Sequence, residues 1–400
     1  MPALTPQQAD QVIRSRVAPQ PAESRPLARC VGRILREDVY AERDNPPFDR
    51  VCMDGIAVAS AAFADGTRRF RLQATQAAGA VPLRLATRDS AIEVMTGAVL
   101  PEGTDSIIPL EEYERSGSEL AMKPEATAAA WRNVQRRGSD SRPGVPMLLA
   151  GMRLGAAEIA VAASAGLARL SVSRQQRVMV VSTGDELIEP GLPIAAHQVR
   201  RSNAYGVVAA LQVHGFYAAG NDHLPDDEQL MRRRLSEHLD VNDVLVLSGG
   251  ISKGKFDFVP AALKHLGVEE VFDEVAQRPA RPMWFGVGPK GQAVFGLPGN
   301  PVATMVCLSR YVLPAMTAAM GAGDPVVERI AMGEAMGAGR RMTYFMPVAL
   351  QADEAQLLAF PRPPNGPGDF LALSGTDGFV ELPPSAAGYP RGFIAHLYRW

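Results

Sequence analysis

The chain has 400 residues, a formal net charge of −2 and 21% charged residues, so its charge gives no argument for nucleic-acid binding. Its apolar content of 46% is ordinary for a globular protein and argues against long disorder. The three cysteines, Cys30, Cys52 and Cys307, stand far apart, which argues against a disulfide framework or a structural zinc site. The N-terminus lacks a signal-peptide pattern and no apolar run approaches membrane-spanning length, so we expect a cytoplasmic protein.

The first 175 residues contain two kinds of pattern. Residues 4–17 have the apolar spacing of a short amphipathic helix, and Asp44–Phe48 is a proline-containing break. From residue 48 to 139, alternating apolar and polar stretches separated by Gly and Pro turns predict a β-rich domain. Residues 140–175 carry further short apolar segments, and we group them with residues 1–47 as one discontinuous domain.

Residues 176–325 alternate between strand and helix patterns. Strands are expected at 177–182, 216–220, 243–248, 268–276 and 283–296, and helices at 203–214, 226–239, 257–266 and 301–320. This order predicts an α/β domain with a mostly parallel sheet and helices on both faces. Gly286–Gly291 matches G-x-G-x-x-G, but it joins two expected strands, so we predict a hairpin rather than a dinucleotide site. Short strands with many Pro and Gly in residues 326–400 predict a small β domain of barrel type.

Three turns that follow expected strands of the α/β domain are typical of anion-binding sites. In Phe295–Pro301, Asn300 is suited to cap the next helix, and a helix N-terminus attracts phosphate groups. The other two turns are Ser182–Glu186 and Ser248–Asp257, where glycines permit close approach of the backbone to a ligand. The predicted substrate contacts in these turns are Thr183, Gly184, Asp185, Ser248, Gly249, Gly250, Ser252, Pro298, Gly299 and Asn300.

Carboxylates and arginines near these turns extend the predicted site. The adjacent carboxylates of Asp185–Glu186 suit Mg²⁺, which prefers one or two carboxylates together with substrate oxygens. Asp257 is equally consistent with a metal ligand and with a cap of the next helix, and the Asp226–Glu228 run by itself indicates helix capping. Arg278 and Arg281 alternate with prolines in a rigid segment, which suits phosphate or carboxylate recognition or else forms a surface turn.

Taken together, motifs in most of the chain resemble the molybdenum insertases of molybdenum-cofactor synthesis, a family of molybdopterin molybdotransferases related to the C-terminal part of gephyrin. The matching segments occur in the order typical of the family. They are Phe48–Asp49, Met53–Gly55, Met95–Gly97, Pro101–Asp105, Asn133–Val134, Arg136–Asp140, Ser182–Leu187, Ser202–Asn203, Asp226–Asp227, Ser248–Ser252, Asp257, Arg278–Pro279, Arg281–Pro282 and Gly296–Val302. The N-terminal motifs separate this family from the smaller adenylyltransferases of the same pathway, which share only the α/β domain.

The resemblance implies a reaction and its participants. Adenylated molybdopterin binds in the α/β domain, molybdate binds nearby, and Mg²⁺-dependent cleavage of the pyrophosphate releases AMP before the metal enters the dithiolene. Glu186, Asp226 and Asp257 are then the expected metal ligands and catalytic carboxylates. Arg278 and Arg281 join the expected substrate contacts.

The resemblance also implies an elongated homodimer. Residues 1–47 and 140–175 would form its linker and dimerisation domain, and residues 48–139 a lid. The active cleft is expected between the α/β domain of one subunit and the β-rich domain of the other, so that Asp54, Thr96 and Asp140 are further candidate catalytic residues. A molybdopterin adenylyltransferase and downstream molybdenum-cofactor proteins are expected partners, whereas nucleic acid and membranes are not.

Two alternatives and three departures stay open on the sequence. An adenylyltransferase would consume ATP, and a non-catalytic molybdopterin-binding scaffold would release no AMP. Ala280 and Arg281 stand where the resembled family usually has Gly and Lys, and Ser139 stands where an acidic residue is common. These departures bear on the details of anion contact. A preference between molybdate and tungstate does not follow from the residues.

Overall fold

A computed structural model describes residues 3–251, 258–323, 326–337, 341–354, 356–366 and 368–400, which form two compact units. The main unit comprises Met1–Glu37, Ala150–Ala156 and Arg169–Trp400, and the inserted unit comprises Asp38–Leu149 and Ala157–Ala168. The chain therefore passes from one unit to the other at 37/38, 149/150, 156/157 and 168/169. The finer domain limits expected from the sequence stay predictions.

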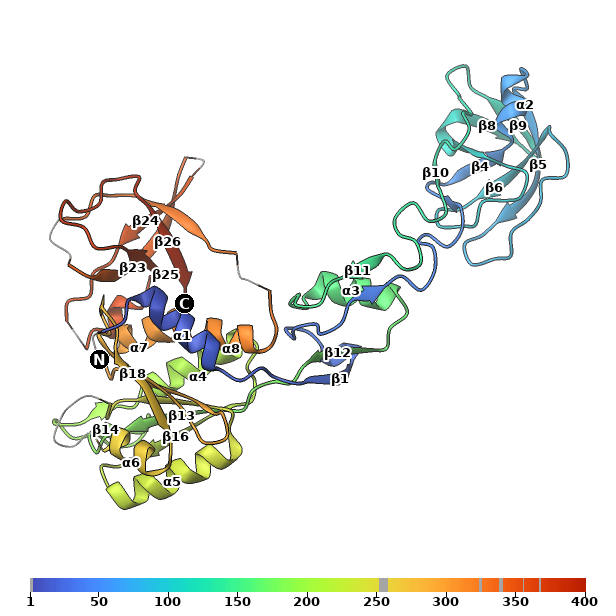
Figure 1. The fold of residues 1–400 in the computed structure, drawn as a ribbon. Coiled ribbons are helices and arrows are strands. Elements are labelled where there is room, and N and C mark those ends of the chain that lie inside the picture. The colour runs from blue at the N-terminus through green and yellow to red at the C-terminus, as the bar shows by residue number, and fades with distance from the viewer. Residues whose placement is uncertain (1–2, 252–257, 324–325, 338–340, 355, 367) are drawn as a thin grey trace. The chain divides into compact units, whose positions relative to one another are not determined.

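The inserted unit is built on a six-stranded sheet in the order β7-β4-β6-β5-β9-β8 (Figure 1). Its pairs are antiparallel except for β5 with β6, and its core includes Ile56, Phe70 and Ile108. The elements are β2 Val39–Tyr40, β3 Arg50–Val51, β4 Gly55–Val58, α2 Ser60–Ala64, β5 Arg69–Gln76, β6 Ser90–Val94, β7 Ser106–Pro109, η2 Leu110–Glu112, β8 Tyr113–Ser116, β9 Glu119–Met122, β10 Val134–Gln135 and β11 Pro146–Leu148, with α3 Ala156–Ser164 starting at the crossing. The prediction of a β-rich region is confirmed.

The α/β part of the main unit has a six-stranded sheet in the order β16-β13-β17-β21-β20-β18. The first four strands are parallel, and β20 and β18 complete the sheet antiparallel, with β20 and β21 joined by the predicted hairpin. The strands are β13 Val178–Thr183, β16 Ala219–Leu224, β17 Val244–Ser248, β18 Glu269–Glu274, β20 Pro282–Val287 and β21 Ala293–Leu297, and the short pair is β14 Leu187–Ile188 with β15 Val199–Arg200. The mostly parallel sheet is as predicted.

Helices cover both faces of this sheet because its buried strands are apolar on both sides. One face packs on α5 Glu228–Val241 and α6 Val259–His265. The other packs on α1 Pro6–Arg16, α4 Asn203–Val213, α7 Pro301–Cys307 and α8 Leu313–Ala319. A π-helical turn, Leu308–Val312, joins α7 to α8. Among the described residues, the stretch Pro301–Ala319 has the length and apolarity of a membrane span, but 78% of its window is buried, as in a core helix.

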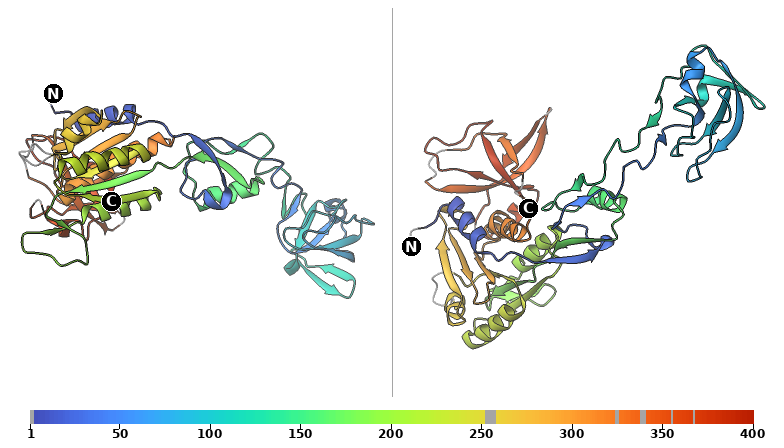
Figure 2. Two further views of the ribbon diagram at one scale, coloured as in Figure 1. Left: turned by 90° about the horizontal axis from the view of Figure 1, so that it is seen from below. Right: turned by 45° about the vertical axis from the view of Figure 1, so that its right-hand side comes forward.

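The C-terminal strands close into a barrel, as predicted for residues 326–400. The order β23-β24-β22-β26-β25 is closed by the pairing of β25 with β23, and β19 Gln277–Arg278 adds to β23. The barrel elements are β22 Arg329–Met332, β23 Thr343–Asp353, β24 Gln356–Pro361, η4 Phe370–Ala372, β25 Gly378–Leu382 and β26 Ile394–Arg399. Helices α1, α7 and α8 lie between sheet and barrel (Figures 1 and 2), and Val302 and Val306 of α7 pack on Phe345 and Phe379.

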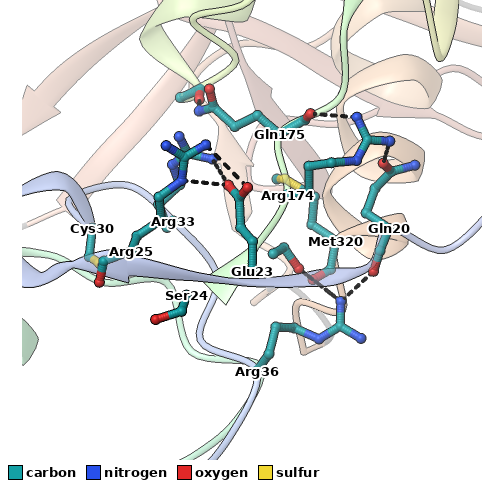
Figure 3. A network of polar contacts seen from close by, with 12 residues as sticks. Gln20, Glu23, Ser24, Arg25, Cys30, Arg33, Arg36, Arg174, Gln175 and Met320 are labelled. Carbon is teal, nitrogen blue, oxygen red and sulfur yellow. Dashed lines mark hydrogen bonds and ion pairs between the residues drawn. The ribbon is translucent and has the colours of Figure 1, made fainter. Parts of the chain in front are cut away.

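A polar network fastens the paired strands β1 Ala22–Pro26 and β12 Arg169–Ser173 to the α/β core, beside the turn η1 Leu27–Arg29 (Figure 3). Arg36 donates to the carbonyl of Gln20 at 2.7 Å and to that of Met320 at 3.4 Å. Arg174 donates to the side chain of Gln20 at 2.6 Å and makes two hydrogen bonds to Asp243, at 2.9 and 3.0 Å. These bonds connect segments that are far apart in the sequence.

Candidate functional site

The three predicted turns meet at the carboxyl edge of the parallel strands. Strand register places Ser182 beside Ser248 and Ser248 beside Leu297, so β13, β17 and β21 end together. Ligands of open α/β sheets bind at this edge. A hollow of about 490 Å³ opens there, and it is lined by Ser182, Thr183, Glu186, Leu187, Val199, Arg200, Arg201, Ser202, Asn203, Ser248, Gly249, Gly299, Pro301, Gly368 and Phe370.

Two hydroxyl groups of this hollow are almost completely buried. Ser182 is 1% and Thr183 is 4% exposed, and neither hydroxyl oxygen has a hydrogen-bond partner within the described part of the chain. A buried hydroxyl without a partner costs about 1–3 kcal/mol, so native proteins nearly always satisfy such groups. The two hydroxyls are therefore suited to accept or donate a hydrogen bond to a polar ligand.

Glycines let the second turn pass close beside the first. Gly249 and Gly250 have φ values of +92° and +65°, in the left-handed region that favours glycine. A Cβ at position 250 would lie 2.6 Å from the Thr183 hydroxyl, and one at position 249 would lie 3.0 Å from the Thr183 carbonyl oxygen. Any larger residue would therefore push the two turns apart.

Asn203 braces two of the turns, a role that sequence reasoning missed. Its side-chain nitrogen lies 3.0 Å from the Ser248 hydroxyl, 2.9 Å from the Gly299 carbonyl and 3.2 Å from the Thr304 hydroxyl. Thr304 in turn donates to the carbonyl of Pro298 at 2.6 Å. The only sequence signal was the Ser202–Asn203 motif, which indicated a family match but did not indicate which residues Asn203 contacts.

The predicted metal ligands are only partly brought together. The carboxylate of Glu186 is exposed and lines the hollow, and the Asp226 amide donates to Asp185 at 3.1 Å. Asp227 caps α5 by accepting from Leu230 at 2.8 Å, which confirms the capping interpretation for this run. Within the described ranges, no group of three His, Cys, Asp or Glu residues is arranged to hold a metal ion. Asp257 and Ser252 lie outside the described residues.

A second hollow, of about 280 Å³, lies on the barrel side of the Pro298–Pro301 turn. Its lining includes Arg278, Asn300, Tyr344 and Asn365. Asn300 caps α7 as predicted, because its side chain accepts from Ala303 at 2.8 Å.

The two predicted arginines separate in the structure. Arg278 lines the second hollow, whereas Arg281 pairs with Glu274 at 3.2 Å and is not among the residues that line it. Between them Ala280 has a φ of +67°, so it occupies a backbone conformation that glycine adopts more easily.

The candidate residues of the inserted unit form local hydrogen bonds. The amide and the hydroxyl of Thr96 both donate to Asp54 at 2.7 Å, and these bonds hold the pKa of Asp54 below its usual range. Asp140 accepts from Gln135 at 2.7 and 2.9 Å and from the Ser139 hydroxyl at 3.0 Å. Hydrogen bonds thereby orient both carboxylates on exposed turns.

Comparison with known proteins agrees with this architecture. Family models match in three consecutive segments: the MoeA N-terminal region (domains I and II) over residues 4–166, a probable molybdopterin-binding domain over 179–318, and the MoeA C-terminal region (domain IV) over 329–398. A molybdopterin molybdenumtransferase of Synechocystis sp. is 37% identical over 371 residues, which are 92% of this chain and 93% of that protein. The chain belongs to the MoeA family.

Solved structures extend the match to the whole fold. A molybdopterin biosynthesis MoeA protein of Pyrococcus horikoshii superposes with a TM-score of 0.80 at 27% identity, covering 99% of both chains. A second structure from that organism superposes with a TM-score of 0.83 at 23% identity, covering 100% of both chains, and supports the fold. The family resemblance predicted from the motifs is thus confirmed.

Some residues that line the two hollows had no signal in the sequence. Arg200 and Phe370 line the first hollow and Tyr344 lines the second, yet each stands in a stretch without a recognisable motif. They reach the site only because β15 and the barrel loops fold against the turns of the α/β sheet. Such long-range neighbours need a structure to be found.

Proposed function

We propose that this protein transfers molybdenum to molybdopterin in molybdenum-cofactor biosynthesis, acting on the adenylated substrate with Mg²⁺-dependent release of AMP. Membership of the MoeA family supports the transferase reaction. The observation that carries the assignment is the hollow at the carboxyl edge of the sheet, where the buried hydroxyls of Ser182 and Thr183 have no hydrogen-bond partner among the residues that the structure describes.

The arrangement of the site suits a long substrate with two ends. The Pro298–Pro301 turn and the helix N-terminus that follows it lie between the two hollows, and the partial positive charge of that helix end would attract a pyrophosphate. The molybdopterin end and the adenylate end of the substrate would extend from this turn in opposite directions. Arg278 in the second hollow would contact an oxyanion, either phosphate or the substrate molybdate.

Glu186 is the residue that would hold Mg²⁺, together with substrate oxygens. Its carboxylate has no hydrogen-bond or ion-pair partner among the described residues and lines the hollow, which fits a metal that needs only one or two protein carboxylates. When bound, Mg²⁺ would neutralise charge on the pyrophosphate as the phosphorus–oxygen bond breaks. Asp226 would orient the site from the neighbouring turn through its contact with Asp185.

A homodimer is part of the proposal, and an apolar surface of the main unit supports it. Val31, Met152, Val213 and Tyr217 are 58%, 37%, 81% and 63% exposed. Arg153 holds their segments together by donating to the carbonyls of Gly32 and His214, at 3.0 and 3.2 Å. Exposed apolar side chains on neighbouring segments are typical of interaction surfaces.

The test is single-turnover chemistry with purified protein and adenylated molybdopterin. We expect AMP release and protein-bound molybdenum cofactor only when both molybdate and Mg²⁺ are added. Glu186→Gln should slow AMP release at least tenfold, whereas the control Glu237→Gln, on the exposed face of α5, should not. Wild-type rates in Glu186→Gln would refute the assigned role of this carboxylate.

The same assay separates the alternatives. Formation of adenylated molybdopterin from ATP and molybdopterin would indicate an adenylyltransferase. Tight substrate binding without AMP release, at any molybdate concentration, would indicate a scaffold.

A further inference from the structure

An arginine–tryptophan stack stands on the surface of the inserted unit, outside the hollows described above. The Arg136 guanidinium carbon lies 3.7 Å from the centre of the Trp131 ring, within cation–π distance. Trp131 is 40% exposed and Arg136 also lies at the surface. Trp131 is not a member of the described core clusters of this unit.

Polar contacts hold the arginine side of the stack in place. Arg136 lies 3.7 Å from Asp49, and the same carboxylate accepts the backbone amide of Arg137 at 2.8 Å. Arg137 also pairs with Asp44 at 2.6 Å. The guanidinium is therefore positioned over the indole before any ligand arrives, and a preformed stack loses little entropy on binding.

The backbone beneath the indole is strained. Trp131 has a φ of +66° and Asn133 a φ of +57°, both in the left-handed region. A bulky side chain is a rare choice there, and such strain persists when the surrounding structure enforces it. The Trp131 amide donates to the Asp105 carbonyl at 2.6 Å, which anchors this conformation. Trp131 is thus a partly exposed aromatic residue at a position whose backbone conformation glycine adopts more easily.

We propose that the Trp131–Arg136 stack is a docking platform for a planar heteroaromatic ring of the substrate. This inference rests on the proposed function, since adenylated molybdopterin carries two such rings, a purine and a pterin. Aromatic side chains bind any flat ring through its face, and an arginine adds cation–π attraction and a donor for ring or phosphate oxygens. The platform stands in the turn region that also holds Asp140, a candidate catalytic residue of this unit.

The test measures ring binding without turnover, using AMP and a free pterin as separate probes. Each is titrated by calorimetry into the full-length wild type and into Trp131→Gly, Trp131→Ala and Trp131→Phe, with Tyr40→Ala as the control because Tyr40 is another exposed aromatic side chain of this unit. We expect Gly and Ala to weaken binding of at least one probe about tenfold, Phe to keep it within about threefold, and the control to change nothing. Weakened AMP binding assigns the purine and weakened pterin binding assigns the pterin.

Thermal unfolding of the same proteins separates binding from structure. Trp131→Gly should keep its fold and unfold close to the temperature of the wild type, because relief of the backbone strain offsets part of the packing lost with the indole. Unchanged affinity of both Trp131→Gly and Trp131→Ala for both probes overturns the inference, as does a Trp131→Gly protein that has lost its fold while Trp131→Ala binds normally. Absence of molybdenum transfer by the wild type, with ring binding intact, would refute the proposed function and leave this platform standing.

Discussion

Removing the side-chain amide of Asn203 should loosen two of the turns that form the site. The amide donates to the Gly299 carbonyl at 2.9 Å and to the hydroxyls of Ser248 and Thr304 at 3.0 and 3.2 Å, so Asn203→Ala removes about two net hydrogen bonds. At about 1 kcal/mol each, the loss is about 2 kcal/mol, which lowers Tm by about 4–8 °C in a unit of this size. Because Ser248 and Gly299 then lose their common support, molybdenum transfer should fall by tenfold or more.

A charge-bearing variant at the same position tests whether the donor hydrogens of Asn203 support the turns. Asn203→Asp keeps the shape, but a carboxylate accepts and does not donate, so it would face the Gly299 carbonyl oxygen with a second acceptor. We therefore expect Asn203→Asp to be less stable and less active than Asn203→Ala in differential scanning calorimetry and in the AMP-release assay. An Asp variant equal to or better than Ala would refute the bracing role.

The control for this series is an asparagine remote from the site. The side chain of Asn242 donates to the His238 carbonyl at 2.9 Å at the end of α5. Asn242→Ala should cost about 1 kcal/mol of stability and leave transfer activity unchanged. Equal loss of activity in both alanine variants would show that the effect at Asn203 is general destabilisation.

Three further predictions concern a turn, an ion pair and a surface. Gly250→Ala should abolish most transfer activity, because its Cβ would lie 2.6 Å from a neighbouring hydroxyl. The control Gly66→Ala, with φ +97° and open space around it, should lower stability alone. Equal transfer rates in the two variants would contradict this prediction. Burial raises the pKa of Asp243, but hydrogen bonds from Arg174 and the Arg177 amide outweigh it, so the pKa lies below its usual range. The stability from this pair is present above the unfolded pKa of about 4 and is lost as the pH falls through the folded pKa; Asp243→Asn should flatten this acid limb in pH-dependent urea unfolding, and an unchanged limb would refute the assignment. Val213→Asp should shift the proposed dimer towards monomer in light scattering. The control Val81→Asp should not, although Val81 is 84% exposed and Val213 81%. A dimer unaffected by Val213→Asp would exclude this surface as the dimer interface.

The elements that the sequence predicted well are those with a repeating physical signal. The apolar strands and amphipathic helices of residues 178–319 follow from periodicity, and Asn300 and Asp227 cap helices as their positions indicated. The closed barrel followed from short strands and turn residues, although its closure by β25 and β23 is a long-range pairing.

The parts of the site that sequence reasoning missed depend on contacts between distant residues. Asn203 meets Gly299 across 96 positions, and no local pattern records that hydrogen bond. Arg281 shows the same dependence, because its place among prolines suited anion recognition or a surface turn, and the structure adds an ion pair with Glu274 that the local pattern did not indicate. Local signals therefore find candidate groups, whereas their partners decide which of them face the ligand.

Because the chain passes four times between the units, some segments can pair only with partners that are synthesised much later. The strand β1 cannot pair until β12 has been made, about 150 residues later, and α1 waits for its neighbour α8, about 300 residues later. Residues 38–149 form most of the inserted unit and are one continuous stretch, so much of this unit is made before the α/β sheet. Helix α1 consequently lacks this packing partner while the intervening residues are made, so part of its apolar face stays uncovered during that time.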